Sequence, residues 1–215
     1  MSNFTIRPAT ADDATAAIPL LLDSGRDALV WAYGLGDEER SARFLRSAFA
    51  RDDTVFSWPH AVVAIDQDEH VVGLMYLHDH DSVEACSGAT IAHLFRYFGF
   101  SIGAWSYWRT IRLGRSLPEP KPGCLHISGL SIAIQARGKG LFGELIELAV
   151  RGGEVKELDY LSLDVEKLNH HAHSCYESKG FVLRYTRPEP AKGLDGYRYY
   201  TRPLMAHSGE DDDDD

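Results

Sequence analysis

The spacing of apolar residues predicts short strands and helices through the first third of the chain. Residues 4–8 alternate between apolar and polar side chains and end in a proline, which is typical of a short edge strand. Helices are predicted after Thr10, a good N-cap, and after Asp37, where apolar residues recur at helical spacing. Two compact apolar runs, 61–65 and 71–77, flank a polar turn and predict a β-hairpin.

The second half of the chain alternates strand and helix. The predicted elements are a strand over 124–134, a helix over 141–149, a strand over 160–165, a helix over 169–179 and two final strands over 181–186 and 197–202. This order indicates a mixed α/β domain.

Between the two halves lies an aromatic segment, residues 88–117. Its apolar residues recur at helical intervals, so we predict a helical insertion or lid with a bend near Gly99 or Gly103. Its uncharged part, residues 97–108, is far shorter than the roughly 20 residues that a membrane-spanning helix needs. A core or dimer surface is the simplest role for this segment, and a lid over a substrate pocket is the functional alternative.

The composition is that of an ordinary soluble globular protein. Of the 215 residues, 44% are hydrophobic and 25% are charged, which excludes a disordered chain and a disulfide-dense scaffold. The formal net charge is −10, but the last six residues are all acidic, so the rest has 22 basic and 26 acidic side chains. A mildly acidic body has no basic footprint for DNA or RNA, and we expect no nucleic-acid partner.

These features also predict the organisation of the chain and its surroundings. We expect one domain over 1–205 and a disordered acidic tail over 206–215. The three cysteines are far apart and form no CxxC pair, which indicates reduced thiols in a cytoplasmic protein. We see no signal peptide and expect no membrane partner, while a homodimer is left open.

A glycine-rich turn carries the densest chemical signal. Gly138, Gly140 and Gly143 lie between a predicted strand and a predicted amphipathic helix. Glycines there let a ligand approach the main chain closely, and the helix adds the positive end of its dipole, so the turn suits a phosphate or pyrophosphate.

Two kinds of phosphate ligand are compatible with this turn. The glycines match G-x-G-x-x-G, and Asp164 follows about twenty residues on, as in dinucleotide-binding units. Against a dinucleotide, residues 135–137 separate the strand from the turn, and only one more strand-helix unit follows. No match to the nucleoside-triphosphate pattern G-x-x-x-x-G-K-[ST] occurs.

The alternative accounts for more residues. The run L-S-I-A-I-Q-A-R-G-K-G over 130–140 resembles the acyl-CoA-binding signature of the GNAT N-acetyltransferase superfamily, L-x-V-x-P-x-x-[RQ]-x-x-G-x-[GA]. A second segment, with Asn169, Ala172, Tyr176, Gly180 and Phe181, is similar to the family's N-x-x-A-x-x-x-Y-x-x-x-G-F. The specific resemblance covers residues 124–186.

The resemblance implies a fold, a reaction and a cofactor site. The fold is a central, mostly antiparallel and splayed sheet with helices on both faces. The reaction moves an acetyl or other short acyl group from acetyl-CoA to a primary amine by direct attack in a ternary complex, without a metal. The acceptor is then a small-molecule amine or a peptide or protein amine. The matching cofactor-binding positions are Leu130, Ser131, Ile132, Arg137, Gly138, Lys139, Gly140, Leu141, Phe142, Gly143, Asn169, Ala172 and Tyr176.

The resemblance also implies catalytic roles, and here the sequence is less complete. Tyr176 would protonate the departing thiolate. Many relatives place a carboxylate on the strand before the signature, but residues 126–130 contain no acid, and His126 is the nearest titratable group. Residues 78–81, His-Asp-His-Asp, are rivals for the base. Phe142 stands where the family usually has glycine or alanine, so its ring must turn into the core to leave the turn open.

Three further hypotheses receive less support. His170 and His173 lie one helical turn apart, but no H-E-x-x-H pattern accompanies them, so we expect no metal site. A non-catalytic acyl-CoA sensor is kept open by the missing strand carboxylate. An NAD-dependent oxidoreductase is the third alternative and depends on the glycine pattern and the position of Asp164.

Overall fold

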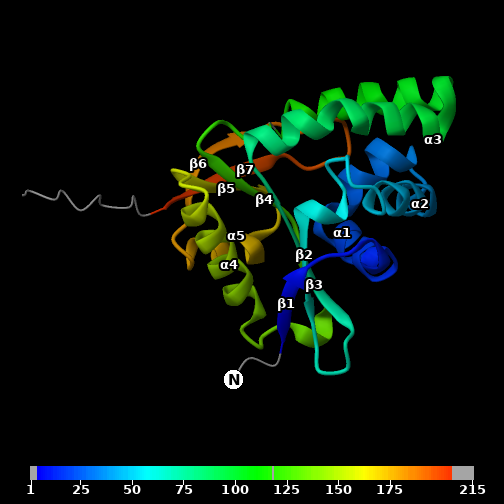
Figure 1. Ribbon diagram of the computed structural model, residues 1–215. Coiled ribbons are helices and arrows are strands. Elements are labelled where there is room, and N and C mark those ends of the chain that lie inside the picture. Colours follow the sequence, from blue (N-terminus) through cyan, green and yellow to red (C-terminus); the bar gives the residue numbers. More distant parts are fainter. Residues whose placement is uncertain (1–3, 118, 205–215) are drawn as a thin grey trace, which may run out of the picture.

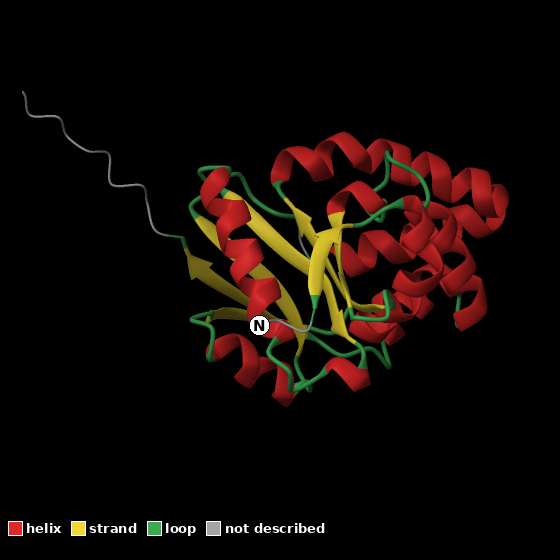
Figure 2. Ribbon diagram, turned by 60° about the horizontal axis from the view of Figure 1, so that its bottom comes forward, coloured by secondary structure: helices red, strands yellow, loops and turns green. Residues whose placement is uncertain are grey.

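A seven-stranded sheet organises residues 4–117 and 119–204, the part of the chain that the computed structural model describes (Figures 1 and 2). The strands lie in the order β1-β2-β3-β4-β5-β7-β6, and every neighbouring pair is antiparallel except β4 and β5. The strands are β1 Thr5–Pro8, β2 Ala61–Ile65, β3 Val71–His78, β4 Cys124–Ile132, β5 Tyr160–Glu166, β6 Val182–Arg187 and β7 Tyr197–Pro203. The mixed, mostly antiparallel sheet expected from the sequence is confirmed.

Helices cover both faces of this sheet, and each face has its own core. The α-helices are α1 Ala14–Leu29, α2 Glu38–Phe49, α3 His80–Gly114, α4 Leu141–Val155 and α5 His170–Glu177. One face packs against α4 and α5, and the other packs against α1, α2 and part of α3 (Figure 1). We call these the α4 face and the α1 face.

The α4 helix forms because its apolar residues recur every four positions. Leu141, Leu145 and Ala149 are at most 1% exposed and pack against buried side chains of the sheet, among them Ile127 and Leu163. Burying one leucine side chain contributes about 2 kcal/mol. This face therefore fixes the start of α4, and with it the glycine turn, relative to β4.

The aromatic segment is a helical hairpin rather than a bent rod. The α3 helix begins at His80, earlier than predicted, and loses helical geometry at Gly99, one of the two residues at which the sequence predicts a bend. The chain reverses direction there. The contact between Phe95 and Tyr107, one on each side of Gly99, shows this, since their ring centroids are 6.1 Å apart. The two arms lie side by side on the α1 side of the sheet (Figure 1).

The strands β4 and β5 part after four residue pairs. They pair in parallel from Cys124 with Tyr160 to Ile127 with Leu163, and the rest of β4 pairs only with β3. A bulge in β4 accompanies this separation, because the register to β3 gains one residue next to Gly129. Bulges bend the strand that carries them. The sheet is therefore splayed at its centre, as the sequence predicts.

Gly129 allows this bulge. Its φ is +58°, and a Cβ built on it would lie 2.9 Å from Tyr76 Cδ2 and 3.0 Å from Leu21 Cδ1. We expect Gly129→Ala to lower the free energy of unfolding by about 2–4 kcal/mol, because left-handed strain and overpacking add. Urea unfolding measures the loss. Gly88→Ala, in α3 with no atom near the added Cβ, is the control and should not be destabilised. Equal midpoints for the two variants would show that Gly129 carries no strain.

Two sequence expectations concern the outside of this fold. Within residues 4–117 and 119–204, no helix combines the length and the apolar character that crossing a lipid bilayer requires. The predicted acidic tail, 206–215, lies outside the described residues.

Candidate active site

The glycine turn connects β4 to α4 and is open. After a short 3₁₀ turn at Ile134–Ala136, Gly138 and Gly140 adopt φ values of +72° and +89°. A Cβ at either position would meet no atom within 4 Å. Glycine is therefore required by the main-chain conformation, and the space above both residues is free for a ligand.

Main-chain donors gather at this turn. The first α4 amides with partners belong to Gly143 and Glu144, and both contact the carbonyl oxygen of Gly140, at 2.9 and 3.3 Å. The amides of 138–142 donate to no group in the described chain. Free N–H groups at the positive end of a 15-residue helix are a ready-made site for phosphate oxygens.

Two lysines lie near the turn, and an arginine holds the turn in place. Arg137 Nε donates to the carbonyl oxygen of Ile132 at 2.8 Å, which ties the turn to the end of β4. Lys139 is exposed in the turn itself. Lys179, which follows α5, lies beside Gly143, because a Cβ there would be 3.0 Å from Lys179 Nζ. The sequence alone does not reveal Lys179, because the approach of this side chain to Gly143 depends on the packing of α5 beside α4.

The Phe142 ring turns away from the open turn and packs against Tyr176. The two ring centroids are 5.3 Å apart in an edge-to-face arrangement, and Phe181 packs on the other side of Tyr176 at 5.6 Å. Edge-to-face pairs of this kind are favourable. The bulky residue at this family position thus supports the tyrosine and leaves the phosphate region free.

Tyr176 is buried except at its hydroxyl. The residue is 8% exposed. Its hydroxyl has no hydrogen-bond partner in the described chain, and the hydroxyl oxygen keeps some accessible surface. Burial raises the pKa of the Tyr176 hydroxyl above its usual value, so the group stays protonated at neutral pH. A fixed ring with a protonated, unpaired tip is suited to donate a proton to a ligand.

Asn169 caps the helix that carries Tyr176. The helix begins at His170 and not at 169 as predicted, and Asn169 Oδ1 accepts from Ala172 N at 3.1 Å. The side-chain NH₂ of Asn169 remains available. Ala172 is half-buried against the α4-face core, as a small residue beside a narrow site should be.

The β4 segment 130–132 lies where the sheet is splayed. Ser131 pairs with Leu74 of β3 and Ile132 with Gly73, while β5 has already separated from β4. The edge of residues 130–132 that faces away from β3 therefore has no strand partner within the described residues. That edge can hydrogen-bond an extended ligand arm in the way that an added strand would.

On the α1 face, His126 lies in a buried polar group that the sequence did not reveal. His126 Nδ1 and Ser162 Oγ are 2.9 Å apart, and His126 Nε2 lies 3.9 Å from Asp164 Oδ2. The His126 side chain is 13% exposed and that of Asp164 is 4% exposed. Both oxygens of Asp164 are buried without a hydrogen-bond partner in the described chain.

Burial shifts the pKa values of this pair in opposite directions. It raises the pKa of the Asp164 carboxyl to about 7 and lowers the pKa of His126 to about 4, because an apolar surrounding disfavours either charge. At neutral pH His126 is therefore neutral, and Asp164 is close to its titration midpoint. A carboxyl in this state can exchange a proton near physiological pH.

The register of the sheet places Asp164 and Tyr176 on opposite faces. Leu163 pairs with Tyr200 of β7, and both belong to the α4-face core together with Tyr176. Asp164, the next residue, therefore points to the α1 face. It is also the first residue of β5 beyond the segment that pairs with β4, so the two titratable groups flank the splay from either side.

At least two of the four rival bases at residues 78–81 have structural partners. His78 Nε2 contacts the carbonyl oxygen of Val55 at 2.9 Å, and burial lowers the pKa of His78 to about 3. Asp79 caps α3 through Ser82 N and pairs with Lys156. These contacts account for His78 and Asp79 without a ligand. The sequence alone could not separate them from His126.

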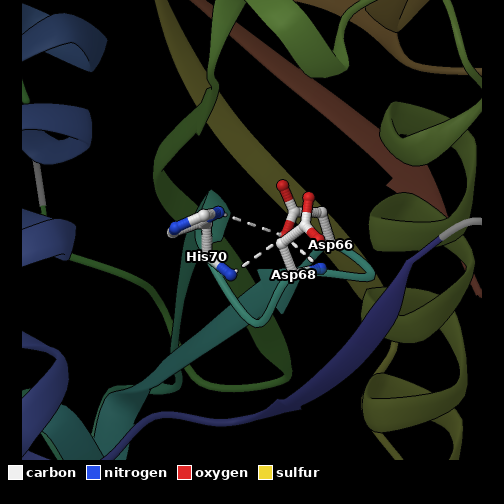
Figure 3. A group of neighbouring side chains, drawn as sticks. All are labelled: Asp66, Asp68 and His70. Atoms are coloured by element: carbon white, nitrogen blue, oxygen red, sulfur yellow. Dashed lines mark hydrogen bonds and ion pairs between the residues drawn. The ribbon is translucent and has the colours of Figure 1, made fainter.

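The described residues contain one group whose side chains are close enough to share a metal ion, and this group includes neither His170 nor His173. Asp66, Asp68 and His70 place ligand atoms within 4.8 Å of one another in the turn between β2 and β3 (Figure 3). Asp66 Oδ1 accepts from the amides of Asp68 and His70 at 3.0 and 2.9 Å, so this carboxylate stabilises the turn itself. His173 is bound through both ring nitrogens, to Tyr200 and to the Lys167 carbonyl.

Solved structures share this fold at low sequence identity. An acetyltransferase crystal structure matches with a TM-score of 0.69 at 20% identity, over 94% of this chain and 100% of its own. A GCN5-related N-acetyltransferase from Kribbella flavida matches with a TM-score of 0.57 at 18% identity, over 94% and 98%. An agmatine N-acetyltransferase matches with a TM-score of 0.53 at 18% identity, over 94% and 100%. At these identities the likeness establishes the fold alone.

The sequence comparisons establish more than the fold. No curated protein matches the chain. The sequence model of the acetyltransferase (GNAT) family, however, matches residues 26–181, which is most of the chain and includes β4, the glycine turn and Tyr176. Members of this family are acyltransferases that use acetyl-CoA, and the match therefore replaces the dinucleotide alternative. On this evidence, the chain belongs to the GNAT acetyltransferase family.

Proposed function

We propose that the protein transfers an acetyl group, or another short acyl group, from acetyl-CoA to a primary amine by direct attack within a ternary complex. The observation that carries this proposal is the open turn at 138–142, whose free amides follow the segment of β4 that has already parted from β5. A diphosphate and an extended arm need these two features next to each other.

The α4 face would then hold the cofactor. The amides of 138–142 bind the diphosphate, with Lys139 nearby, and the unpaired edge of 130–132 binds the pantetheine arm. The same main-chain edge can stabilise negative charge on the acyl oxygen as the amine attacks. Tyr176 protonates the thiolate that leaves, so the carbon–sulfur bond breaks without releasing a bare anion.

The α1 face would receive the amine. His126, neutral and next to the splay, can accept a hydrogen bond from the amine or take its proton. The acceptor is a small-molecule amine or the amine of a peptide or protein. We further propose that the segment 88–117, most of the α3 hairpin, acts as a lid on this side of a single catalytic domain.

The cofactor site can be tested without knowing the acceptor. We expect Gly140→Ala to weaken CoA binding about tenfold or more, because the new methyl group enters the open space where the diphosphate would lie. Gly36→Ala is a matched control, since Gly36 has a φ of +95° and equally open surroundings but lies before α2. Both variants should lose a similar stability, about 1–2 kcal/mol. Isothermal titration with CoA measures the affinity.

Two outcomes would contradict the proposal. The cofactor site is wrong if CoA fails to bind the wild-type protein, or binds Gly140→Ala as tightly as Gly36→Ala. The transfer reaction is wrong if CoA binds but acetyl-CoA releases no free thiol with any member of a broad panel of amines. That second result would favour the non-catalytic sensor.

A further inference from the structure

The Asp164 carboxyl lacks the partner that a buried polar group normally has. Its side chain is 4% exposed, and neither oxygen makes a hydrogen bond in the described chain. Buried polar side-chain atoms nearly always have a partner, because leaving water without one destabilises the fold. A carboxyl kept in this state therefore calls for a functional explanation.

The groups around Asp164 do not neutralise it. The titratable groups that face it or act on it through their charge are His126 and Cys124 on β4, Arg187 on β6, and Tyr197 and Tyr199 on β7, of which Tyr199 pairs directly with Asp164. Arg187, the cation among them, is engaged elsewhere: it donates to the carbonyl oxygen of Arg115 at 3.2 Å and to the hydroxyl of Tyr185 at 3.0 Å. The position beside Asp164 therefore has no protein cation bound to it within the described residues.

The separation of Asp164 and His126 matches the dimensions of an ammonium site. Asp164 Oδ2 and His126 Nε2 are 3.9 Å apart, and Ser162 Oγ holds the opposite ring nitrogen of His126 at 2.9 Å. A nitrogen atom about 3 Å from both atoms would complete a triangle with ordinary hydrogen-bond lengths. An ammonium group supplies the positive charge for the carboxylate and a donor for the neutral imidazole.

We propose that Asp164 is the catalytic base: the acceptor's ammonium group lies between Asp164 and His126, and Asp164 takes one of its protons. This inference rests on the proposed acyl transfer. It also supplies the carboxylate that residues 126–130 lack, from the neighbouring strand β5 and from the face opposite Tyr176.

Protons and electrons balance across this arrangement. One N–H bond of the ammonium breaks and an O–H bond forms on Asp164, which leaves a lone pair on the nitrogen. That pair forms the new C–N bond, the C–S bond breaks, and the thiolate takes the Tyr176 proton. The nitrogen's second proton, lost as the amide forms, replaces the one that Tyr176 gave. Asp164 then returns its proton to solvent.

The first test does not depend on turnover. The probe is methylammonium chloride, the smallest primary ammonium salt, added to full-length protein with ¹³C-labelled aspartate. The Asp164 carboxyl resonance, assigned by its loss in Asp164→Asn, should titrate at least one pH unit lower in methylammonium. Tetramethylammonium chloride at equal ionic strength is the control and should leave it unchanged, because that ion has no N–H donor. If the midpoint of the Asp164 titration is the same with and without methylammonium, the proposed ammonium site is wrong.

The second test is kinetic and separates a catalytic from a structural role. Acetyl-CoA is held saturating while butylamine, spermidine or an alanine-terminated peptide is varied. In the wild type, kcat/KM should rise with pH through an inflection near the carboxyl's pKa of about 7. In Asp164→Asn it should fall by about 10²- to 10⁴-fold and lose that inflection, while CoA affinity stays within about twofold. An unchanged rate or an unchanged inflection would remove Asp164 from the mechanism.

Failure of the two proposals can be told apart. If the wild type binds methylammonium at Asp164 but transfers no acyl group to any of the three amines, the acyl-transfer proposal fails and the ammonium site stands. If the wild type is active and Asp164→Asn keeps its rate and pH profile, the acyl transfer stands and Asp164 is not the base.

Discussion

Replacing Tyr176 by phenylalanine is expected to lower kcat by about 10²- to 10³-fold while leaving the affinity for acetyl-CoA within about twofold. The phenylalanine ring keeps the contacts with Phe142 and Phe181, and the lost hydroxyl has no hydrogen-bond partner in the described chain. Folding should therefore be almost unaffected. What disappears is the proton for the leaving thiolate.

The raised pKa of Tyr176 is compatible with this role. The same burial that disfavours the phenolate also disfavours the thiolate that leaves beside it, so their proton affinities rise together. Proton transfer between the two then stays nearly balanced in energy. A donor with an unshifted pKa would match the leaving group less well in a dry groove.

Tyr33→Phe is the matched control for this prediction. Tyr33 is also 8% exposed, its hydroxyl also has no hydrogen-bond partner in the described chain, and burial also raises its pKa. It lies in the α1-face core, away from α4 and α5. Steady-state thiol release and titration with acetyl-CoA measure both variants. Equal kcat values for the two variants would remove Tyr176 from the reaction.

The second large effect concerns stability rather than rate. We expect Asp164→Asn to be more stable than the wild type above pH 7, by up to about 4 kcal/mol, and equally stable near pH 4. The native carboxyl has its pKa raised to about 7, whereas an unfolded aspartate titrates near 4. Between these values the native state binds more protons, so wild-type stability falls as pH rises. The variant has no such loss.

Urea unfolding at several pH values between 4 and 8.5 measures this difference. His126 acts in the opposite sense, because its native pKa is lowered to about 4, but it is present in both proteins and largely cancels. Asp68→Asn removes an exposed carboxyl and controls for the change in net charge. If the free energy of unfolding changes with pH by the same amount in Asp164→Asn and in the wild type, then burial of this carboxylate does not destabilise the folded protein.

The two effects expected of Asp164→Asn, a higher stability and a lower turnover, describe a trade between stability and function. A carboxyl that destabilises the folded protein is retained only where it is useful, and such groups concentrate at active sites. Asn is nearly isosteric with Asp, so a more stable residue is available at this position. The expected gain in stability and loss of turnover in one variant is the signature of a functional residue.

The open glycine turn could be predicted from the sequence because its signals are local. Gly138 and Gly140 lie two residues apart between a strand and a helix, and the conformation they allow depends on no distant residue. The α4 helix likewise follows from the spacing of Leu141 and Leu145. Local patterns of this kind need no knowledge of the sheet.

The proximity of His126 and Asp164 could not be predicted, because it depends on the register between β4 and β5. His126 and Asp164 are 38 residues apart in sequence and meet only because Ile127 pairs with Leu163. The alternation in β5 places Asp164 opposite the α4-face core, and an alternating strand is usually polar toward water. Here helices cover that face too, so the same pattern buries the carboxyl. An acidic residue between the apolar residues Leu163 and Val165 was the one available signal.

The insertion point of the α3 hairpin has a consequence for how this protein can change. His78 at the end of β3 pairs directly with His126 of β4, so the chain leaves the sheet after His78 and returns to it at Cys124, at a neighbouring position. Lengthening or shortening such an excursion costs little in chain entropy and does not disturb the strand pairing. Evolution, or an engineer, can therefore exchange this module as a unit, while the strand pairing on either side of it is inherited intact.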